Sequence, residues 1–193
     1  REVLDVLDMQ LVQYGSALIQ RRQTFAEELG EIVHRIHSQL SGGQEEMELK
    51  YEPNVTVDAF AQMLFSNRER DMRLKTTATG PHRDDISFVV NGVDIRKFGS
   101  QGQQRTAALS LKLSEIELVK RLIGDTPVLL LDDVLSELDS GRQNYLLNSI
   151  ENIQTLITCT GLDEFVNHRF SINRIYKVTD GSVTVENKQE ADR

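Results

Sequence analysis

The stretch that constrains this chain most is residues 128–133, where four apolar residues run directly into two adjacent carboxylates, Asp132 and Asp133. A short apolar run between the Gly124 and Pro127 breakers and these charges predicts a strand buried on both faces, as in a parallel sheet. Open α/β sheets place their ligand sites at the carboxyl ends of such strands. Two neighbouring acids are costly there unless a cation lies beside them, and a phosphate-bound Mg²⁺ is one candidate. The alternative is a strand that ends in a solvated acidic turn, and the stretch alone does not decide between the two.

Composition narrows the class of protein further. The 193 residues are 39% hydrophobic and 27% charged, as expected for a soluble globular protein with one α/β domain or two small lobes. No apolar run reaches membrane-spanning length, no signal peptide is visible, and a single cysteine, Cys159, fits a reducing cytoplasm. The net charge of −8 argues against a surface that binds nucleic acid everywhere, so a DNA contact would need a local basic patch. Arg1 stands inside a helical pattern without an initiator methionine, and we therefore expect a fragment.

The first 40 residues predict helix, because apolar residues recur at spacings of three and four and no proline interrupts them. Gly15 is the weak point of this pattern and suggests a bend between two helices. Residues 40–44 then spell Leu-Ser-Gly-Gly-Gln, the letters of the ABC signature, but they follow a helix instead of leading into one. We interpret them as a helix-ending turn and not as a phosphate site. Residues 47–52 alternate like an exposed strand, which Pro53 closes.

A second helix is predicted from Thr56 to about Lys75. Its second half is rich in arginine and, together with the residues just beyond it, forms the most positive local surface of an acidic chain. A solvated charged helix is the ordinary interpretation, and contact with a phosphate backbone is the alternative. The candidate DNA contacts are Arg68, Arg70, Arg73 and Arg83.

A hairpin and a glycine-rich loop come next. Residues 86–90 and 93–95 alternate as strands around Asn91-Gly92, a pair that favours a type I′ turn. The loop at 98–106 contains small residues and opens into a long helix, so its amides and the Ser100 hydroxyl form a cradle for an anion. An ordinary serine N-cap is the alternative. The order of loop, helix, apolar strand and paired acids favours the anion site, because it is more specific than any of its parts.

The segment after the paired acids completes an α/β pattern. Ser136 and Asp139 stand where they would cap a following helix. The elements predicted here are a helix at 140–150, a buried strand at 154–158 and a closing hairpin at 174–178 and 182–185, before a frayed polar tail from Glu186.

These motifs together resemble the RecF family of bacterial recombination proteins, which are SMC/Rad50-like ATPases. Residues 100–105 resemble the ABC signature, 128–133 the Walker B strand and 136–139 the D-loop, and the sequence Thr-Gly-Pro-His-Arg-Asp-Asp at 79–85 is also similar to the family. The resemblance covers the whole chain. It implies an α/β fold, with the C-terminal half of an ABC-type ATPase head at 79–193 and a mainly helical arm lobe at 1–78.

The resemblance also implies a role for each motif residue. In a head-to-tail homodimer that encloses ATP, the signature of one subunit would contact the nucleotide held by the other. Asp132 would bind Mg²⁺, Asp133 would orient the hydrolytic water, and Ser136 and Asp139 would lie at the dimer contact. The contacts made in trans would come from Ser100, Gln101, Gly102, Gln103 and Arg105. Gln101, in place of the usual signature glycine, and Asp133, in place of the usual glutamate, both fit RecF better than a transporter.

Partners follow from the same resemblance. Members of the family bind duplex DNA beside single-stranded gaps and work with RecR and RecO to load RecA. Such a protein would act in DNA repair, recombination, replication and the SOS response, in the bacterial cytoplasm at the nucleoid and without a membrane.

The chain departs from a complete ATPase head. It contains no P-loop of the form G-x-x-x-x-G-K-[ST], so we expect that half of the head N-terminal to Arg1 and no ATP hydrolysis by the chain alone. ABC transporters carry a switch histidine after the strand at 154–158, whereas this chain has Thr158-Cys159-Thr160. A hydroxyl of Thr158 or Thr160 is therefore the candidate for a γ-phosphate contact.

Two other functions are weighed against this one. A nucleotide-binding subunit of an ABC transporter is disfavoured by the missing switch histidine and the long helical arm. A module that only binds DNA or RecR through its arm is compatible with the RecF interpretation, because a fragment can retain that activity alone.

Overall fold

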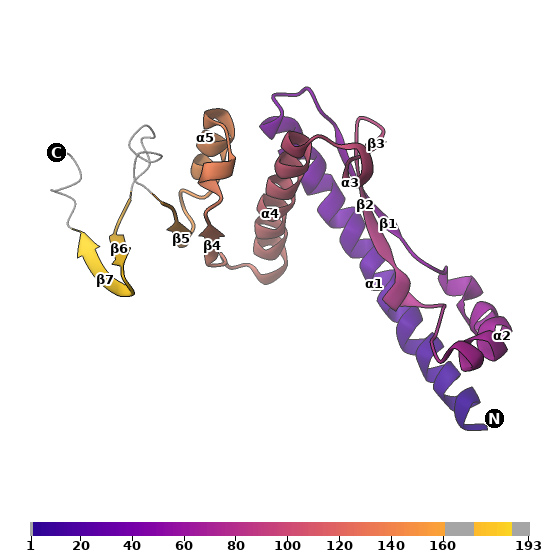
Figure 1. Ribbon diagram of the computed structural model, residues 1–193. Coiled ribbons are helices and arrows are strands. Elements are labelled where there is room, and N and C mark those ends of the chain that lie inside the picture. Colours follow the sequence, from indigo (N-terminus) through magenta and orange to yellow (C-terminus); the bar gives the residue numbers. More distant parts are fainter. Residues whose placement is uncertain (1, 161–171, 187–193) are drawn as a thin grey trace. The chain divides into compact units, whose positions relative to one another are not determined.

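A computed structural model describes residues 2–160 and 172–186 of the chain (Figure 1). Contacts divide it into two compact units, Arg1–Pro127 and Val128–Arg193. The expected boundary between an arm lobe at 1–78 and a head at 79–193 falls inside the first unit. The division into these two lobes stays a prediction.

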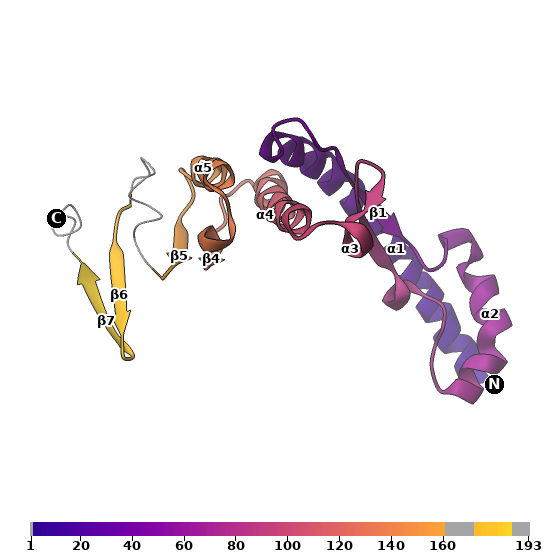
Figure 2. The ribbon, with the colours of Figure 1, turned by 45° about the horizontal axis from the view of Figure 1, so that its top comes forward.

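The first unit is built on one long helix, α1 (Glu2–Leu40), which continues through Gly15 without a break. Helix α2 (Val57–Leu74) lies beside its N-terminal half (Figures 1 and 2). The bend expected at Gly15 is wrong: a Cβ added there would lie 2.5 Å from Cε1 of Phe60, a fully buried residue of α2. The glycine therefore allows close packing of two helices, and it does so without breaking the first.

The turn that follows α1 has the form expected of a helix end. Gly42 and Gly43 have φ values of +64° and +77°, and the Gly43 amide donates to the Ser38 carbonyl at 2.7 Å. Such a 6→1 bond with a left-handed glycine is typical of a C-terminal cap, not of a phosphate loop. The interpretation of residues 40–44 as a turn is confirmed.

A small antiparallel sheet packs against α1. It has the order β1 (Met47–Glu52), β2 (Asp85–Val90), β3 (Val93–Asp94), and Met47 pairs with Val90 at one end of the register. Asn91 and Gly92 both have positive φ, 48° and 82°, which confirms the predicted type I′ turn. The 3₁₀ turn η1 (Pro81–Arg83) precedes β2.

Two helices follow the sheet. The strand predicted at 93–95 ends at Asp94, so its last residue is wrong, and Ile95 begins the short helix α3 (Ile95–Phe98). Four residues carry no periodic signal from which this helix could be predicted. Helix α4 (Gln101–Ile123) packs on the C-terminal half of α1 and ends at Gly124, whose φ is +73°. This packing holds the first turn of α4 close to the turn that ends α1.

The second unit contains a parallel strand pair. Strand β4 (Leu129–Asp132) pairs with β5 (Thr155–Thr158), so that Asp132 lies opposite Thr158. Between them lie η2 (Leu135–Glu137) and α5 (Ser140–Ser149). The antiparallel hairpin β6 (Ile175–Thr179) and β7 (Ser182–Glu186) closes the described part as predicted, and the tail from residue 187 lies outside it.

The predictions that residues 128–131 are buried on both faces and that 154–158 form a buried strand are wrong for this structure. Leu131 is only 7% exposed, but Leu130 is 72% and the neighbouring Leu156 55% exposed. In the described part of the unit, β4 and β5 are the only strands of this sheet, and their side chains on one face remain in solvent. Burial of the second face depends on neighbours that these residues do not supply.

Candidate functional site

The signature segment begins α4 with a capping box centred on Ser100. The Ser100 hydroxyl accepts a hydrogen bond from the Gln103 amide at 3.2 Å, and the Ser100 amide donates to Oε1 of Gln103 at 3.1 Å. The amides of Gln101 and Gly102 occupy the first two helical positions, which no intrahelical carbonyl can reach. The Ser100 hydroxyl accepts from the Gln103 amide, is exposed and still has its own proton to donate. The first turn of α4 therefore presents three donors to an anion.

The remaining signature residues divide into two kinds. Gln101, Gly102 and Arg105 are exposed, as a contact with a second subunit requires. Gln103 is half-buried, and its Nε2 donates to Oε1 of Glu45 at 2.9 Å, so both ends of its amide already have protein partners. The structure gives Gln103 a role in holding the cap, and its predicted nucleotide contact stays a prediction.

Two contacts that support the signature were not foreseen from the sequence. Gln104 donates through Nε2 to the Ile95 carbonyl at 2.9 Å and thereby fastens α3 to α4. Glu45 comes from the turn after α1, 58 residues before its partner Gln103. No spacing or periodicity connects positions so far apart, so this contact could be found only from the fold.

The paired acids lie at the carboxyl end of β4, as predicted. Asp132 is the last residue of the strand, and Asp133 follows with φ of +50°, a conformation that a non-glycine residue rarely adopts. The Asp133 amide donates both to the Thr158 carbonyl at 3.2 Å and to the Thr158 hydroxyl at 3.0 Å. The same hydroxyl donates to Oδ1 of Asp132 at 2.5 Å. Thr158 therefore bridges the two acids and orients the Asp132 carboxylate.

This arrangement fits a magnesium ligand of the kind found in nucleotide sites. The Asp132 side chain is exposed, and one of its oxygens is fixed by Thr158. Within residues 2–160 and 172–186 no group of three or more His, Cys, Asp or Glu side chains is placed to hold a metal. Mg²⁺ in phosphate sites typically uses one or two carboxylates, with phosphate and water as the other ligands. Thr160 is exposed, whereas the Thr158 hydroxyl already has two partners, so Thr160 is the better placed of the two candidates for a phosphate contact.

The D-loop residues have local partners. The Ser136 hydroxyl donates to the Asp133 carbonyl at 2.9 Å, and Oδ1 of Asp139 accepts from the Arg142 amide at 3.0 Å as the N-cap of α5. The hydrogen bond from the Arg142 backbone, together with the charge of its guanidinium, holds the pKa of Asp139 below its usual value. The capping interpretation of Asp139 is confirmed, and the dimer contact of both residues stays a prediction.

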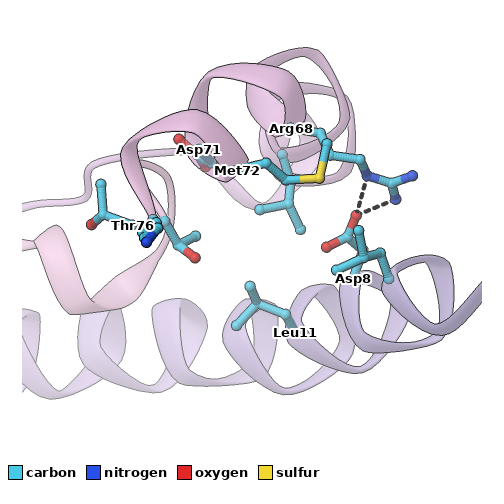
Figure 3. A pocket seen from close by; sticks show the side chains of 10 residues that line it. Asp8, Leu11, Arg68, Asp71, Met72 and Thr76 are labelled. Carbon is cyan, nitrogen blue, oxygen red and sulfur yellow. Dashed lines mark hydrogen bonds and ion pairs between the residues drawn. The ribbon is translucent and has the colours of Figure 1, made fainter. Parts of the chain in front are cut away.

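The four candidate DNA contacts are not equivalent. Arg68 forms ion pairs with Asp5 and Asp8 of α1, beside a hollow of about 330 Å³ between α1 and α2 (Figure 3). Its charge is therefore neutralised within the unit, and its pKa is raised chiefly by the hydrogen bond to Asp8. Arg70, Arg73 and Arg83 are exposed, and no ion pair among the described residues includes them. These three are the better placed for a phosphate backbone.

Arg83 stands on a firmly held turn. The next residue, Asp84, has a side chain that is only 3% exposed and accepts hydrogen bonds from Arg22 at 3.0 Å, from the Asn54 amide at 2.9 Å and from the Tyr51 hydroxyl. Burial, together with the hydrogen bond to Asp84, raises the pKa of Tyr51 to about 12. Asp84 thus ties η1 to α1 and β1, which explains structurally one of the residues that carried the family resemblance.

A serine-capped helix start, paired acids at the end of a parallel strand and a long helix are the features of part of an SMC-like, ABC-type ATPase fold. Known proteins with similar sequences are RecF proteins. The chain is 59% identical to the DNA replication and repair protein RecF of Lachnospira eligens, over 96% of the chain and 51% of that protein. It is 41% identical to RecF of Clostridium perfringens, over 94% of the chain and 52% of that protein. The resemblance to RecF is confirmed, and the chain spans about half the length of the curated relatives it matches.

Solved structures agree with these relatives. A RecF–ATP structure, described as a recombination mediator protein in the RecFOR pathway, is 34% identical with a TM-score of 0.83 and covers 97% of the chain and 51% of its own. A RecF–ATPrS structure gives 0.81 over 95% of the chain and 50% of its own. A structure from a study of SMC ATPases, 14% identical with a TM-score of 0.52 over 90% of the chain and 92% of its own, supports the fold alone. No family model matches the chain. None of the helices in the described ranges has the length and apolarity that a membrane crossing requires.

Proposed function

We propose that this chain is part of an ATP-dependent DNA-binding protein of recombinational gap repair, and that it supplies the signature of an ATP-enclosed dimer. The observation that carries the proposal is the first turn of α4, where a capping box fixes Ser100 beside the exposed residues Gln101 and Gly102, whose amides stand at the first two helical positions. A helix start of this kind favours an anion with several oxygens, because the amides and the helix dipole act together. The RecF relatives and their ATP-bound structures support a nucleotide as that anion.

The acid pair has a separate task in this proposal. Mg²⁺ bound with ATP would neutralise phosphate charge, and Asp132 would be its protein ligand, oriented by the Thr158 hydroxyl. Asp133 would accept a hydrogen bond from the attacking water and hold it in line, and its backbone is fixed by two hydrogen bonds to Thr158. Thr160 is the proposed donor to the γ-phosphate in place of the switch histidine. Ser136 and Asp139 would meet the second subunit.

DNA and protein partners belong to the same proposal. Arg70, Arg73 and Arg83 would contact phosphates of duplex DNA beside a gap, in a bacterial cytoplasm where RecR and RecO act with the protein to load RecA. The description of the RecF–ATP structure as a mediator in the RecFOR pathway supports these partners. A transporter subunit gains no support, since the curated relatives named above are DNA replication and repair proteins RecF.

Association with a complete relative tests the proposal. We would mix this chain with full-length RecF of L. eligens, and measure complex formation by sedimentation with ATP, with ADP and without nucleotide. Association that requires ATP and falls at least about tenfold in Ser100→Ala is expected, because the substitution removes a donor to a charged group. The matched control is Ser149→Ala, at the far end of α5. Association independent of ATP, or insensitive to Ser100, would contradict the proposal.

A second candidate, a module that only binds DNA, is favoured by the unneutralised arginines of the arm. If the chain alone binds gapped duplex DNA through them, its affinity should fall steeply with salt, with a slope of about 0.9 per phosphate contact. Arg73→Gln should reduce that slope, whereas Arg68→Gln should change it less, because Arg68 is already paired with Asp5 and Asp8. Equal effects of the two substitutions on the salt dependence would show that the ion pairs of Arg68 do not keep it from contacting DNA.

A further inference from the structure

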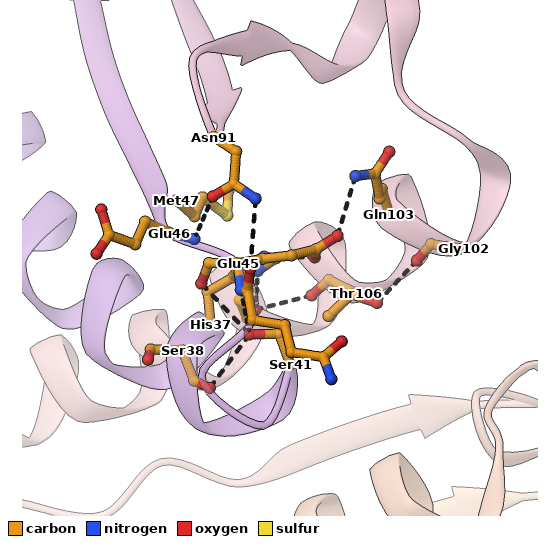
Figure 4. Close-up of polar contacts among 12 residues, drawn as sticks. His37, Ser38, Ser41, Glu45, Glu46, Met47, Asn91, Gly102, Gln103 and Thr106 are labelled. Carbon is orange, nitrogen blue, oxygen red and sulfur yellow. Dashed lines mark hydrogen bonds and ion pairs between the residues drawn. The ribbon is translucent and has the colours of Figure 1, made fainter.

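A buried polar cluster joins the end of α1 to the signature helix. His37, the fully buried histidine at the end of α1, has Nδ1 3.0 Å from the Ser110 hydroxyl of α4 and Nε2 3.2 Å from Oε2 of Glu45 (Figure 4). Buried polar groups of this kind are costly unless they are paired, so their partners are held in defined positions. The cluster therefore fixes where the Glu45 carboxylate lies.

The other oxygen of Glu45 reaches the first turn of α4. Oε1 of Glu45 accepts from Nε2 of Gln103 at 2.9 Å, and Oε1 of Gln103 accepts from the Ser100 amide at 3.1 Å. A glutamine side chain has several rotatable bonds and can adopt many rotamers, of which only some place its oxygen on the N-cap amide. With its amide nitrogen held by Glu45, the carboxamide oxygen is directed at Ser100.

The turn at residues 40–44, with the letters Leu-Ser-Gly-Gly-Gln, positions the backbone of Glu45. The Ser41 hydroxyl accepts from the Glu45 amide at 3.2 Å and lies 3.3 Å from the Glu45 carbonyl. Together with the glycine cap, these contacts fix the backbone of Glu45, so that its side chain reaches His37 and Gln103 at once. An exposed surface carboxylate would not have this support, and the side chain of Glu45 is only 21% exposed.

We propose that Glu45 is a positioning residue for the signature: it holds Gln103 so that the capping box directs the Ser100 hydroxyl and the free helix amides at the nucleotide of the second subunit. The inference rests on the proposed function for its consequence, but the contact itself can be tested without nucleotide. It also makes the end of the arm helix and the first turn of α4 a single rigid element.

Three variants of the chain test the proposal: Glu45→Ala, Glu45→Gln and, as a matched control on the next residue, Glu46→Ala, whose side chain is exposed. Amide hydrogen exchange of Ser100, followed by NMR in the absence of nucleotide, reports the cap directly. Glu45→Ala should speed this exchange about tenfold, the factor that corresponds to one hydrogen bond of ordinary strength. Glu45→Gln should restore most of the protection, because its carbonyl oxygen can still accept from Gln103. Unchanged exchange at Ser100, or equal acceleration along all of α4, would overturn the proposal.

ATP-dependent association with full-length L. eligens RecF gives the second measurement. Glu45→Ala should weaken it several-fold while Glu46→Ala and nucleotide-free DNA affinity stay as in the parent chain. If Ser100→Ala weakens association and Glu45→Ala does not, the positioning role is wrong and the proposed function stands. If neither affects association but Glu45→Ala still exposes the Ser100 amide, the contact is real and the proposed function is wrong.

Discussion

The signature turn and the acid pair differ in how completely the chain itself supports them. At the start of α4, Ser100 and Gln103 form two reciprocal hydrogen bonds, and Glu45, which contacts the buried His37, accepts a hydrogen bond from the Gln103 side chain. At the end of β4, Thr158 holds both the Asp132 carboxylate and the Asp133 amide, and the Ser136 hydroxyl reaches only the Asp133 carbonyl. The strand pair that carries these residues has one face in solvent. The geometry of the signature turn is fixed by contacts within its own unit. The geometry of the acid pair is fixed on the side of β5 only.

The contacts indicate which of the two sites keeps its geometry without a ligand or a second subunit. A preorganised donor turn keeps its geometry before a ligand arrives, and little free energy is then needed to order it. The acid pair has a strained backbone at Asp133 and a carboxylate oriented by one hydroxyl, so its geometry depends on further contacts. Substitutions at the acids should therefore affect turnover, and substitutions at the signature turn should affect folding and association.

The largest expected effect is that of Asp133→Asn on ATP turnover. We would fuse the P-loop half of L. eligens RecF to the N-terminus of this chain and measure steady-state hydrolysis with and without the substitution. Loss of the carboxylate that orients water should lower turnover by about 10²–10⁴-fold. Asp180→Asn, an isosteric change in the β6–β7 turn, should leave it unchanged. Full turnover in Asp133→Asn would show that another group activates the water.

The next effect tests the residue that holds the Asp132 carboxylate. Thr158→Val keeps the shape of the side chain but removes the hydroxyl that bridges Asp132 and the Asp133 amide. Partners that orient a metal ligand are typically worth about 10–100-fold in metal affinity or activity, so the Mg²⁺ concentration for half-maximal turnover of the fusion should rise by a factor in this range. Thr158→Ser keeps the hydroxyl and should behave nearly like the parent. An unchanged Mg²⁺ requirement in Thr158→Val would remove Thr158 from the site.

Much of the fold was predictable, because its signals are local. Helical periodicity located α1, α2 and α4, and Asn91-Gly92 and Asp180-Gly181 located two hairpins, since both pairs tolerate the positive φ that the turn requires. The signature and the acids were found from their order along the chain.

The remaining features depend on contacts between distant residues. The sequence around Gly15 suggests a bend because its partner Phe60 lies on another helix. Arg68 resembles its exposed neighbours in sequence because Asp8 stands 60 positions away. The exposed face of β4 could not be foreseen either, because burial of a strand depends on elements outside its own sequence. Local sequence patterns identify an element, but its surroundings are set by the rest of the fold.

The third prediction concerns the stability of the first unit. Ser100→Ala removes the N-cap acceptor of α4 and should lower the free energy of unfolding by about 1 kcal/mol, whereas Ser100→Gly should cost only a few tenths because glycine suits the cap backbone. Urea unfolding followed by circular dichroism measures both. A loss of no more than a few tenths of a kcal/mol in Ser100→Ala would mean that the capping box contributes little to the stability of α4, and the contrast between the two sites would then be weaker than the contacts indicate.

The smallest effect is expected at Leu130, and it tests the other side of the comparison. The side chain is 72% exposed, so Leu130→Gln should change the unfolding free energy of this chain by no more than about 0.5 kcal/mol, as is usual for surface positions. Leu131→Gln, on the 7% exposed side of the same strand, is the matched control and should be strongly destabilising, because it buries an amide without a partner. In the fusion with the P-loop half of L. eligens RecF, Leu130→Gln should become costly if that half covers the open face of the sheet. A substitution that is neutral in both proteins would mean that the face stays in solvent, and the support of the acid pair would then have to come from the dimer and not from its own head.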